Sequence, residues 1–169
     1  YTYYTFRLNK NPEEAMHFIE YGVLGVLLFR ALSHRVRDPT IYVSAALIGC
    51  MVGMVDETIQ WITPRRFFDY RDIWLNAFSG LLVQIAIDRG LQPRHIKMPV
   101  RPFSIQILCR LAAALLVFFG FCFSNTPARI EWLVSKIPSL NYMLEGDTAM
   151  SEYGHRFEDP EIGSFYSRF

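Results

Sequence analysis

Four long apolar segments, separated by short polar stretches, give the chain its pattern. They cover residues 15–32, 42–62, 73–87 and 103–123. A helix rises about 1.5 Å per residue and the hydrocarbon core of a bilayer is about 30 Å thick, so about 20 apolar residues span it. The first segment is just long enough, the second and fourth are comfortably long, and the third needs neighbouring polar residues drawn towards the membrane surface. The pattern predicts an all-α integral membrane helical bundle with four transmembrane helices.

Small residues occur where these helices would touch. Gly49 and Gly53 are four positions apart in the second segment, and Gly22 and Gly25 lie in the first. Lipid tails are as apolar as helix side chains, so close helix contact in a bilayer depends on small residues that let two backbones approach. The glycines therefore predict helix–helix contacts along the first and second segments.

Basic residues gather in two of the connecting regions and predict the orientation. The first region holds Arg30, Arg35 and Arg37, and the second holds Arg89, Arg94, Lys97 and Arg101. Short loops rich in Lys and Arg stay on the cytoplasmic side of a membrane. We therefore expect loops 33–41 and 88–101 in the cytoplasm. Loop 63–72 and the C-terminus are then extracytoplasmic, although loop 63–72 carries three arginines of its own.

The chain changes character after residue 124. Residues 127–137 place apolar side chains along one side of a short amphipathic helix, which would lie at the outer membrane surface. Residues 138–169 mix turns, acids and aromatic residues, which is too little for a second core. We expect a transmembrane domain over residues 1–124 and an extracytoplasmic extension over residues 125–169, with residues 138–169 as a candidate contact for partner subunits.

Composition narrows the function classes. Apolar residues make up 51% of the chain, and the formal net charge is +1. A charge so close to zero offers no broad basic surface, so we expect no nucleic-acid partner. Cys50, Cys109 and Cys122 all lie inside apolar segments, which favours small core residues over a disulfide framework or a metal site. The chain opens at Tyr1, which leaves open whether a further helix precedes it.

The most unusual stretch is the hairpin of residues 53–80, which joins the second apolar segment to the third. Acids and amides lie inside both segments, where such groups are costly in a bilayer and usually functional. Residues 56 and 60 share one helix face, residues 72 and 76 share another, and residues 17 and 20 lie at the same predicted membrane side. The predicted polar cluster comprises His17, Glu20, Asp56, Glu57, Gln60, Arg66, Asp69, Asp72 and Asn76.

Binding is the function that suits this cluster best. Arg66 fits contact with a phosphate or carboxylate group, because a guanidinium donates two parallel hydrogen bonds. Asp56 and Asp72 fit hydroxyl or cationic groups, and Gln60 and Asn76 would orient the ligand. A membrane lipid headgroup or a cell-wall precursor at the outer leaflet carries these groups.

Two other functions stay open. A membrane enzyme could hydrolyse a lipid-linked substrate with a carboxylate pair and His17 as proton shuttle, or with a metal ion held by Asp56, Glu57, Asp72 and His17. No nucleophile and no tight metal-ligand motif stands out, so we expect no cofactor and prefer binding to catalysis. The polar groups could also satisfy one another and fix helix register in a structural subunit of a larger membrane complex.

The spacing of these residues resembles the signature of the VanZ-like family. Asp56-Glu57-x-x-Gln60 is followed by Pro64-x-Arg66-x-x-Asp69-x-x-Asp72 and then by Asn76-x-x-x-Gly80. His17-Phe18-x-Glu20-Tyr21, followed by Leu24-Gly25, resembles the preceding helix of that family. The resemblance covers residues 14–90. One departure is Glu14, where many relatives carry a lysine three residues before the histidine, so the charge balance of a shared site would differ.

The resemblance implies a bacterial multi-pass protein of the inner (plasma) membrane. The family's namesake is an accessory glycopeptide-resistance protein that lowers susceptibility to teicoplanin. The implied theme is therefore the cell envelope and antibiotic resistance, and the implied partners are a membrane lipid or a cell-wall precursor.

Overall fold

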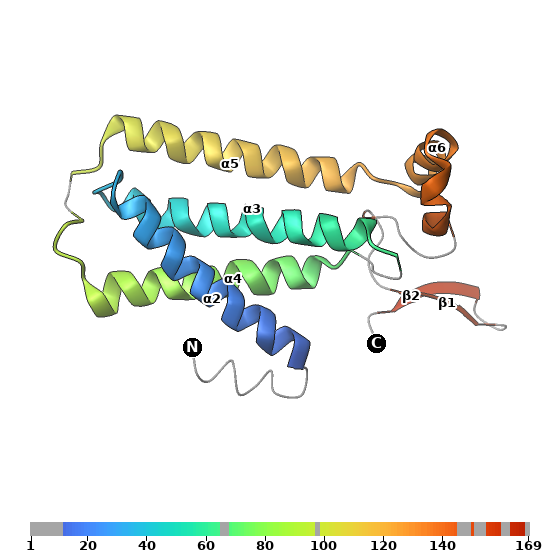
Figure 1. Cartoon of the computed structure of the whole chain (residues 1–169), viewed down its shortest axis with the longest axis horizontal. Coiled ribbons are helices and arrows are strands. Elements are labelled where there is room, and N and C mark those ends of the chain that lie inside the picture. The colour runs from blue at the N-terminus through green and yellow to red at the C-terminus, as the bar shows by residue number, and fades with distance from the viewer. Residues whose placement is uncertain are drawn as a thin grey trace. The chain divides into compact units, whose positions relative to one another are not determined.

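The computed structural model describes residues 12–64, 68–96, 99–144, 150, 155–159 and 163–167. In chain order the elements are α2 (Pro12–Ser33), α3 (Thr40–Ile62), α4 (Tyr70–Ala86), the π-helix η2 (Ile87–Leu91), α5 (Pro102–Phe123), α6 (Pro127–Lys136), the 3-10 helix η3 (Pro138–Leu144), β1 (His155–Asp159) and β2 (Gly163–Ser167) (Figure 1). The two strands pair antiparallel, with His155 opposite Ser167. The all-α class is confirmed, and the short strand pair is an addition that the sequence pattern did not predict.

Three helices in the described part of the chain are long and apolar enough to cross a membrane. They are Ala15–Ser33 within α2, Thr40–Ile62, which is all of α3, and Pro102–Phe123, which is all of α5. Three of the four predicted spans are thereby confirmed as helices that are long and apolar enough to cross. α4 has 17 residues, so its length of about 25 Å falls short of a bilayer core of about 30 Å. The fourth span stays a prediction, because the third apolar segment is the short one.

The chain divides into two compact units. Unit 1 comprises residues 1–54 and 71–116, and unit 2 comprises residues 55–70 and 117–169. Unit 1 holds α2, η2 and most of α3, α4 and α5. Unit 2 holds the last turns of α3 and α5 together with α6, η3 and the strands. The predicted domain boundary after residue 124 stays a prediction.

Glycines bring three helices into close contact in unit 1. A side chain added at Gly53 of α3 would meet Asn76 of α4 and Tyr21 of α2, each at 3.4 Å. One added at Gly25 of α2 would meet Val83 of α4, also at 3.4 Å. The helix contacts predicted from the glycines are therefore confirmed at these two positions, and they join α2, α3 and α4 into one packed group.

An apolar cluster closes unit 1 where α2 leads into α3. Phe29, Ile41, Val83 and Ile87 are buried together, and Ile96 packs against them. The ring of Phe29 stacks on that of Tyr42, with centroids 5.7 Å apart, and also lies 6.4 Å from the ring of His95. The loop after α2 and the loop before α5 therefore lie at the same end of unit 1, as Figure 1 shows.

Aromatic rings fill the core of unit 2. Tyr70 stacks on Phe123 of α5 with centroids 4.9 Å apart, and it meets Phe68 edge to face at 4.8 Å. The predicted short helix is present as α6, which buries Ile130 and Val134. The hydroxyl group of a tyrosine in η3, Tyr142, donates to the backbone carbonyl of Ile62 at the end of α3.

The three cysteines are free thiols. Cys122 is buried, as expected of a small core residue, and Cys50 is half-buried. Cys109 is exposed on α5, so its predicted core position is wrong. An apolar residue on a membrane helix can face lipid as well as protein, and hydropathy does not separate the two.

Candidate functional site

Four of the predicted polar residues meet around the carboxylate of Glu57 in unit 2. The Glu57 side chain is buried, with 1% of the residue exposed. One carboxylate oxygen accepts a hydrogen bond from the backbone N–H of Asp69 at 3.2 Å, and the other accepts one from the side-chain amide of Gln60 at 3.2 Å. The same amide donates to Asp56 at 3.3 Å. Asp56, Glu57, Gln60 and Asp69 form the Glu57 network.

The Glu57 network fixes a loop to a helix and leaves one acid accessible. An amide nitrogen carries two hydrogens, so Gln60 can serve both carboxylates at once. The bond from the Asp69 backbone holds the chain just before α4 against the last turns of α3. Asp56 is half-buried rather than buried, so its carboxylate remains available to a hydroxyl or ammonium group from outside.

The remaining predicted residues belong mostly to unit 1. On α2 the Nδ1 atom of His17 lies 3.8 Å from a carboxylate oxygen of Glu20, a contact that becomes an ion pair only when the imidazole is protonated. Asp72 lies in the first turn of α4, where its negative charge complements the helix dipole. Arg66 lies outside the described residues, so its predicted contact with an anion stays a prediction.

Asn76 is the most deeply buried of the predicted residues in unit 1. It is 1% exposed, and its side chain lies against Gly53 of α3, where an added Cβ would meet it at 3.4 Å. Neither polar atom of its side chain has a hydrogen-bond partner among the residues that the structure describes. A buried amide left unpaired costs about 1–3 kcal/mol. Such a group calls for a partner from outside these residues, as a bound water or a polar ligand atom would provide.

The predicted cluster is thus divided between the units. Asp56, Glu57, Gln60 and Asp69 are in unit 2, whereas His17, Glu20, Asp72 and Asn76 are in unit 1. The Glu57 network and the His17–Glu20 contact are separate local contacts, and the meeting of all nine residues in one site stays a prediction. In the described part of the chain, no three His, Cys, Asp or Glu side chains are grouped closely enough to hold a metal ion.

A buried acid that the sequence reasoning missed joins two helices in unit 1. Asp38 is 3% exposed. Its Oδ1 atom accepts from the backbone and hydroxyl of Thr40 at 3.0 and 2.6 Å, and its Oδ2 atom accepts from the Ser104 hydroxyl at 2.5 Å. Burial acts to raise the pKa of Asp38, but the hydrogen bonds from Ser104 and Thr40 outweigh it, so the pKa lies below the ordinary value of 3.8.

Part of this junction could have been found in the sequence. Asp38-Pro39-Thr40 is a helix-start pattern, with an acceptor side chain and a proline directly ahead of the helix. Nothing in the sequence points to Ser104 as its partner.

On α4, Ser79 donates to the carbonyl of Phe18 at 2.5 Å and Gln84 donates to the carbonyl of Gly25 at 2.9 Å. Polar residues along one face of an apolar helix are the available signal for those bonds.

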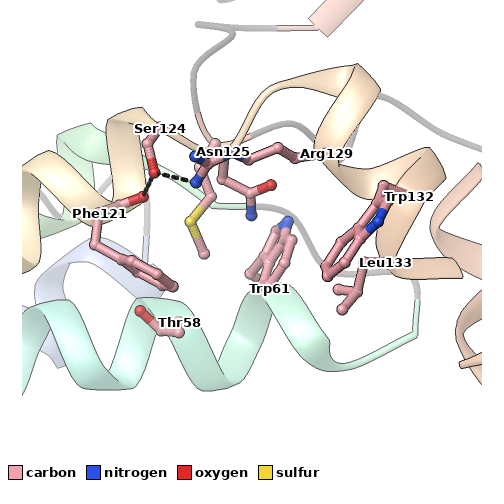
Figure 2. A pocket seen from close by; sticks show the side chains of 9 residues that line it. Thr58, Trp61, Phe121, Ser124, Asn125, Arg129, Trp132 and Leu133 are labelled. Carbon is pink, nitrogen blue, oxygen red and sulfur yellow. Dashed lines mark hydrogen bonds between the residues drawn. The ribbon is translucent and has the colours of Figure 1, made fainter. Parts of the chain in front are cut away.

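Unit 2 also contains a cavity that the sequence did not predict. Its volume is about 610 Å³, and Figure 2 shows side chains from the ends of α3 and α5 and from α6 around it. Its lining includes Thr58, Trp61, Phe121, Arg129, Trp132 and Leu133. None of these residues belongs to the predicted polar cluster. The lining residues come from segments far apart in the chain, so no local sequence pattern predicts the cavity.

Comparison with known proteins bears on the first half of the chain. A family described as VanZ/LLP1 matches residues 4–87. This stretch holds α2, α3, α4 and all nine residues of the predicted polar cluster, whereas α5, α6 and the C-terminal strands lie beyond it. No curated protein and no solved structure matches the chain.

Proposed function

The chain is a VanZ-like membrane protein, and from that premise we propose that its polar cluster binds a cell-envelope component, either a lipid headgroup or a peptidoglycan-related ligand. The observation that carries the proposal is the Glu57 network. It places two carboxylates and an amide in the last turns of an apolar helix that is long enough to span. Ionisable groups at such a position are costly and are usually retained for a function.

The chemistry of the network favours binding. The hydrogen bonds to Glu57 come from a backbone N–H and from Gln60, so its carboxylate is already held and acts as support. Asp56 shares that support and remains half-exposed, which suits a hydroxyl or ammonium group of a ligand. Sugars, glycerol and amine headgroups carry such donors, and Arg66 would contact their phosphate.

The proposed orientation follows from the basic loops. The loop after α2 and the loop before α5 lie at the same end of unit 1 and carry exposed arginines, among them Arg35, Arg37 and Arg94. The positive-inside rule favours this end in the cytoplasm of the bacterial inner membrane. Loop 63–72 and the Glu57 network would then lie at the outer surface, where envelope precursors are presented.

Substitution of the acids tests the proposal. Asp56→Ala and Asp72→Ala should leave the protein inserted and folded, because both side chains are half-buried rather than buried. In cells, both variants should lose the effect of the expressed protein on teicoplanin susceptibility. In native mass spectrometry, both purified variants should no longer retain the amphiphile that the wild type retains. Glu131→Ala, at an exposed acid of α6, is the control and should change neither.

The outcomes separate binding from its rivals. Unchanged susceptibility and unchanged retained amphiphile in both acid variants would refute the proposal. A retained amphiphile that wild type converts to a product, and that the variants bind unconverted, would identify an enzyme instead. Co-purification of other membrane proteins, lost in both variants, would identify a structural subunit.

A further inference from the structure

We propose that the cavity in unit 2 is a phospholipid-binding site, with the lipid phosphate at Arg129 and an acyl chain against Trp61 and Trp132. The inference goes beyond the proposed function, because none of the lining residues belongs to the polar cluster. Part of the cavity lining comes from α5 and α6, which follow residue 87 and lie outside the family match.

The cavity has the size and the surface of a site for an amphiphile. Its volume of about 610 Å³ lies inside the range of about 300–1,000 Å³ that ligand sites occupy. Phe121 and Trp132 line it and are 65% and 62% exposed. Large apolar side chains that line a hollow while remaining exposed provide a surface that an acyl chain can cover.

Arg129 gives the cavity its charge. It is the single ionisable side chain among the lining residues, all of which lie in the described part of the chain. Its Nη1 atom donates to the Ser124 hydroxyl at 2.8 Å, and that hydroxyl donates to the Phe121 carbonyl at 2.7 Å (Figure 2). A guanidinium carries five N–H donors, so the Ser124 contact positions the group and leaves donors for a ligand. No ion pair of Arg129 is found among the described residues.

The surrounding donors favour phosphate. Ser124 and Asn125 also line the cavity and lie beside Arg129 in Figure 2. Arginine binds phosphate through two parallel hydrogen bonds, and the side-chain amide of Asn125 can donate to a remaining phosphate oxygen. The Ser124 hydroxyl donates to Phe121 and holds the guanidinium in place. The lining contains no carboxylate that would repel an anion.

The position of the cavity favours a membrane lipid over a soluble phosphate ester. Thr58 and Trp61 lie in the last turns of α3, and Phe121 lies in the last turn of α5. Both helices are candidate spans that end there, at Ile62 and Phe123. The end of a span is the depth at which headgroups lie, and tryptophan is enriched at that depth. A lipid would therefore meet the cavity with its phosphate towards Arg129 and its chain towards the tryptophans.

Tryptophan fluorescence can report on this site alone. The chain has three tryptophans, and Trp74 of α4 is the one outside the lining. In the full chain with Trp74→Phe, purified in a maltoside detergent, the remaining signal comes from Trp61 and Trp132. Phosphatidylglycerol with brominated chains should quench this signal saturably. Brominated diacylglycerol with the same chains, which lacks the phosphate, should quench it weakly and without saturation.

Charge variants on one helix provide the decisive comparison. Arg129→Gln should raise the half-quenching lipid concentration about tenfold, the effect of losing one charge-assisted hydrogen-bond set. Lys136→Gln removes the same charge from α6 at an exposed residue outside the lining, and should leave the concentration unchanged. Arg129→Lys keeps the charge and should fall between them. Circular dichroism of each variant establishes that it is folded.

Four results would overturn the proposal. Equal quenching by the two brominated lipids would show that the phosphate is not recognised. Equal losses in Arg129→Gln and Lys136→Gln would show general attraction to positive charge. Displacement of the brominated lipid by inorganic phosphate would identify a soluble anion as the ligand, and displacement by decanoate alone would identify a fatty acid. Displacement only by unbrominated phosphatidylglycerol supports a phospholipid site.

Discussion

α3 and α5 are both long enough to cross a membrane, yet they are packed very differently. They have 23 and 22 residues, and their mean hydropathies are 1.4 and 2.2. Of the spanning window, 44% is buried in α3 but only 6% in α5. The less apolar helix is the one that packs against the protein. In a membrane protein, the hydropathy of a helix indicates that it spans, and the polar and small residues that interrupt it indicate what it contacts.

The difference in burial between α3 and α5 arises because a membrane helix is surrounded by lipid instead of water. In water, burying an apolar face lowers the free energy of the protein. In a bilayer, exchanging lipid for protein at an apolar face lowers it only a little. Helices are therefore held together by close backbone approach and by hydrogen bonds. α3 has Gly53 and Glu57 for these purposes, whereas Leu116 and Val117 of α5 are 70% and 74% exposed, as suits contact with lipid.

The largest effect expected from this comparison is at the glycines. Gly53→Leu should destabilise the protein by about 3 kcal/mol or prevent folding, because an added Cβ alone would already contact Asn76 and Tyr21 at 3.4 Å and the rest of a leucine side chain has no room. Gly120→Leu makes the same change on α5, where nothing lies within 4 Å, and should cost less than about 0.5 kcal/mol. Unfolding of both variants in mixed micelles with increasing dodecyl sulfate measures the difference. Equal losses would show that α5 packs as tightly as α3.

Hydropathy and the positions of small residues predict the spans and some of the helix contacts. The spans of α2, α3 and α5 follow from the length of their apolar segments, and the contacts at Gly25 and Gly53 follow from the need for close approach. The fourth span stays a prediction, since α4 has 17 residues and is followed directly by the π-helix η2. The strand pair of five residues each was missed, because neither segment is long enough to show a clear alternation.

The candidate site could be predicted where a single helix defines it. Helical spacing predicts that Asp56 and Gln60 share a face, and the structure shows them hydrogen-bonded. The bond from the same amide to Glu57 was not among the predictions. The Asp69 backbone contact, the Asp38–Ser104 bond and the cavity escaped prediction, because each joins segments separated by a turn or by many residues. Position along one helix is encoded locally, whereas position between helices is set by packing.

A buried charge on α3 should matter more than an exposed charge on α5. Glu57→Ala removes the carboxylate that accepts from the Asp69 N–H and one of the two acceptors of the Gln60 amide, and should cost about 2 kcal/mol. Arg110→Ala removes the exposed charge of α5 and should change the stability by less than about 0.5 kcal/mol. Glu57→Gln keeps one acceptor oxygen and should lose less than Glu57→Ala. A cost at Arg110 equal to that at Glu57 would contradict the comparison.

The smallest effect is expected where the two helices meet. Asp38 accepts hydrogen bonds from Thr40 at the start of α3 and from Ser104 in the first turn of α5, so it ties together two helix N-termini. Its pKa is lower in the folded protein than the ordinary 3.8. A carboxyl with a lowered folded pKa stabilises the fold at pH values above its unfolded pKa, and this contribution is lost as the pH falls through the folded pKa.

The contribution of Asp38 to the unfolding free energy should therefore be constant from neutral pH down to about pH 5 and then decline by about 1 kcal/mol as the pH falls further. Asp38→Asn removes the titrating group, so this part of the decline should be absent and the variant should be less stable at pH 7. Ser104→Ala deletes one of the bonds that lower the pKa, so its decline should be smaller than in wild type. Because Asp38 bonds to both helices, a loss in Ser104→Ala as large as that in Asp38→Asn would place the whole stabilisation at α5. A loss in Asp38→Asn alone would place it at the start of α3, the packed helix of the pair.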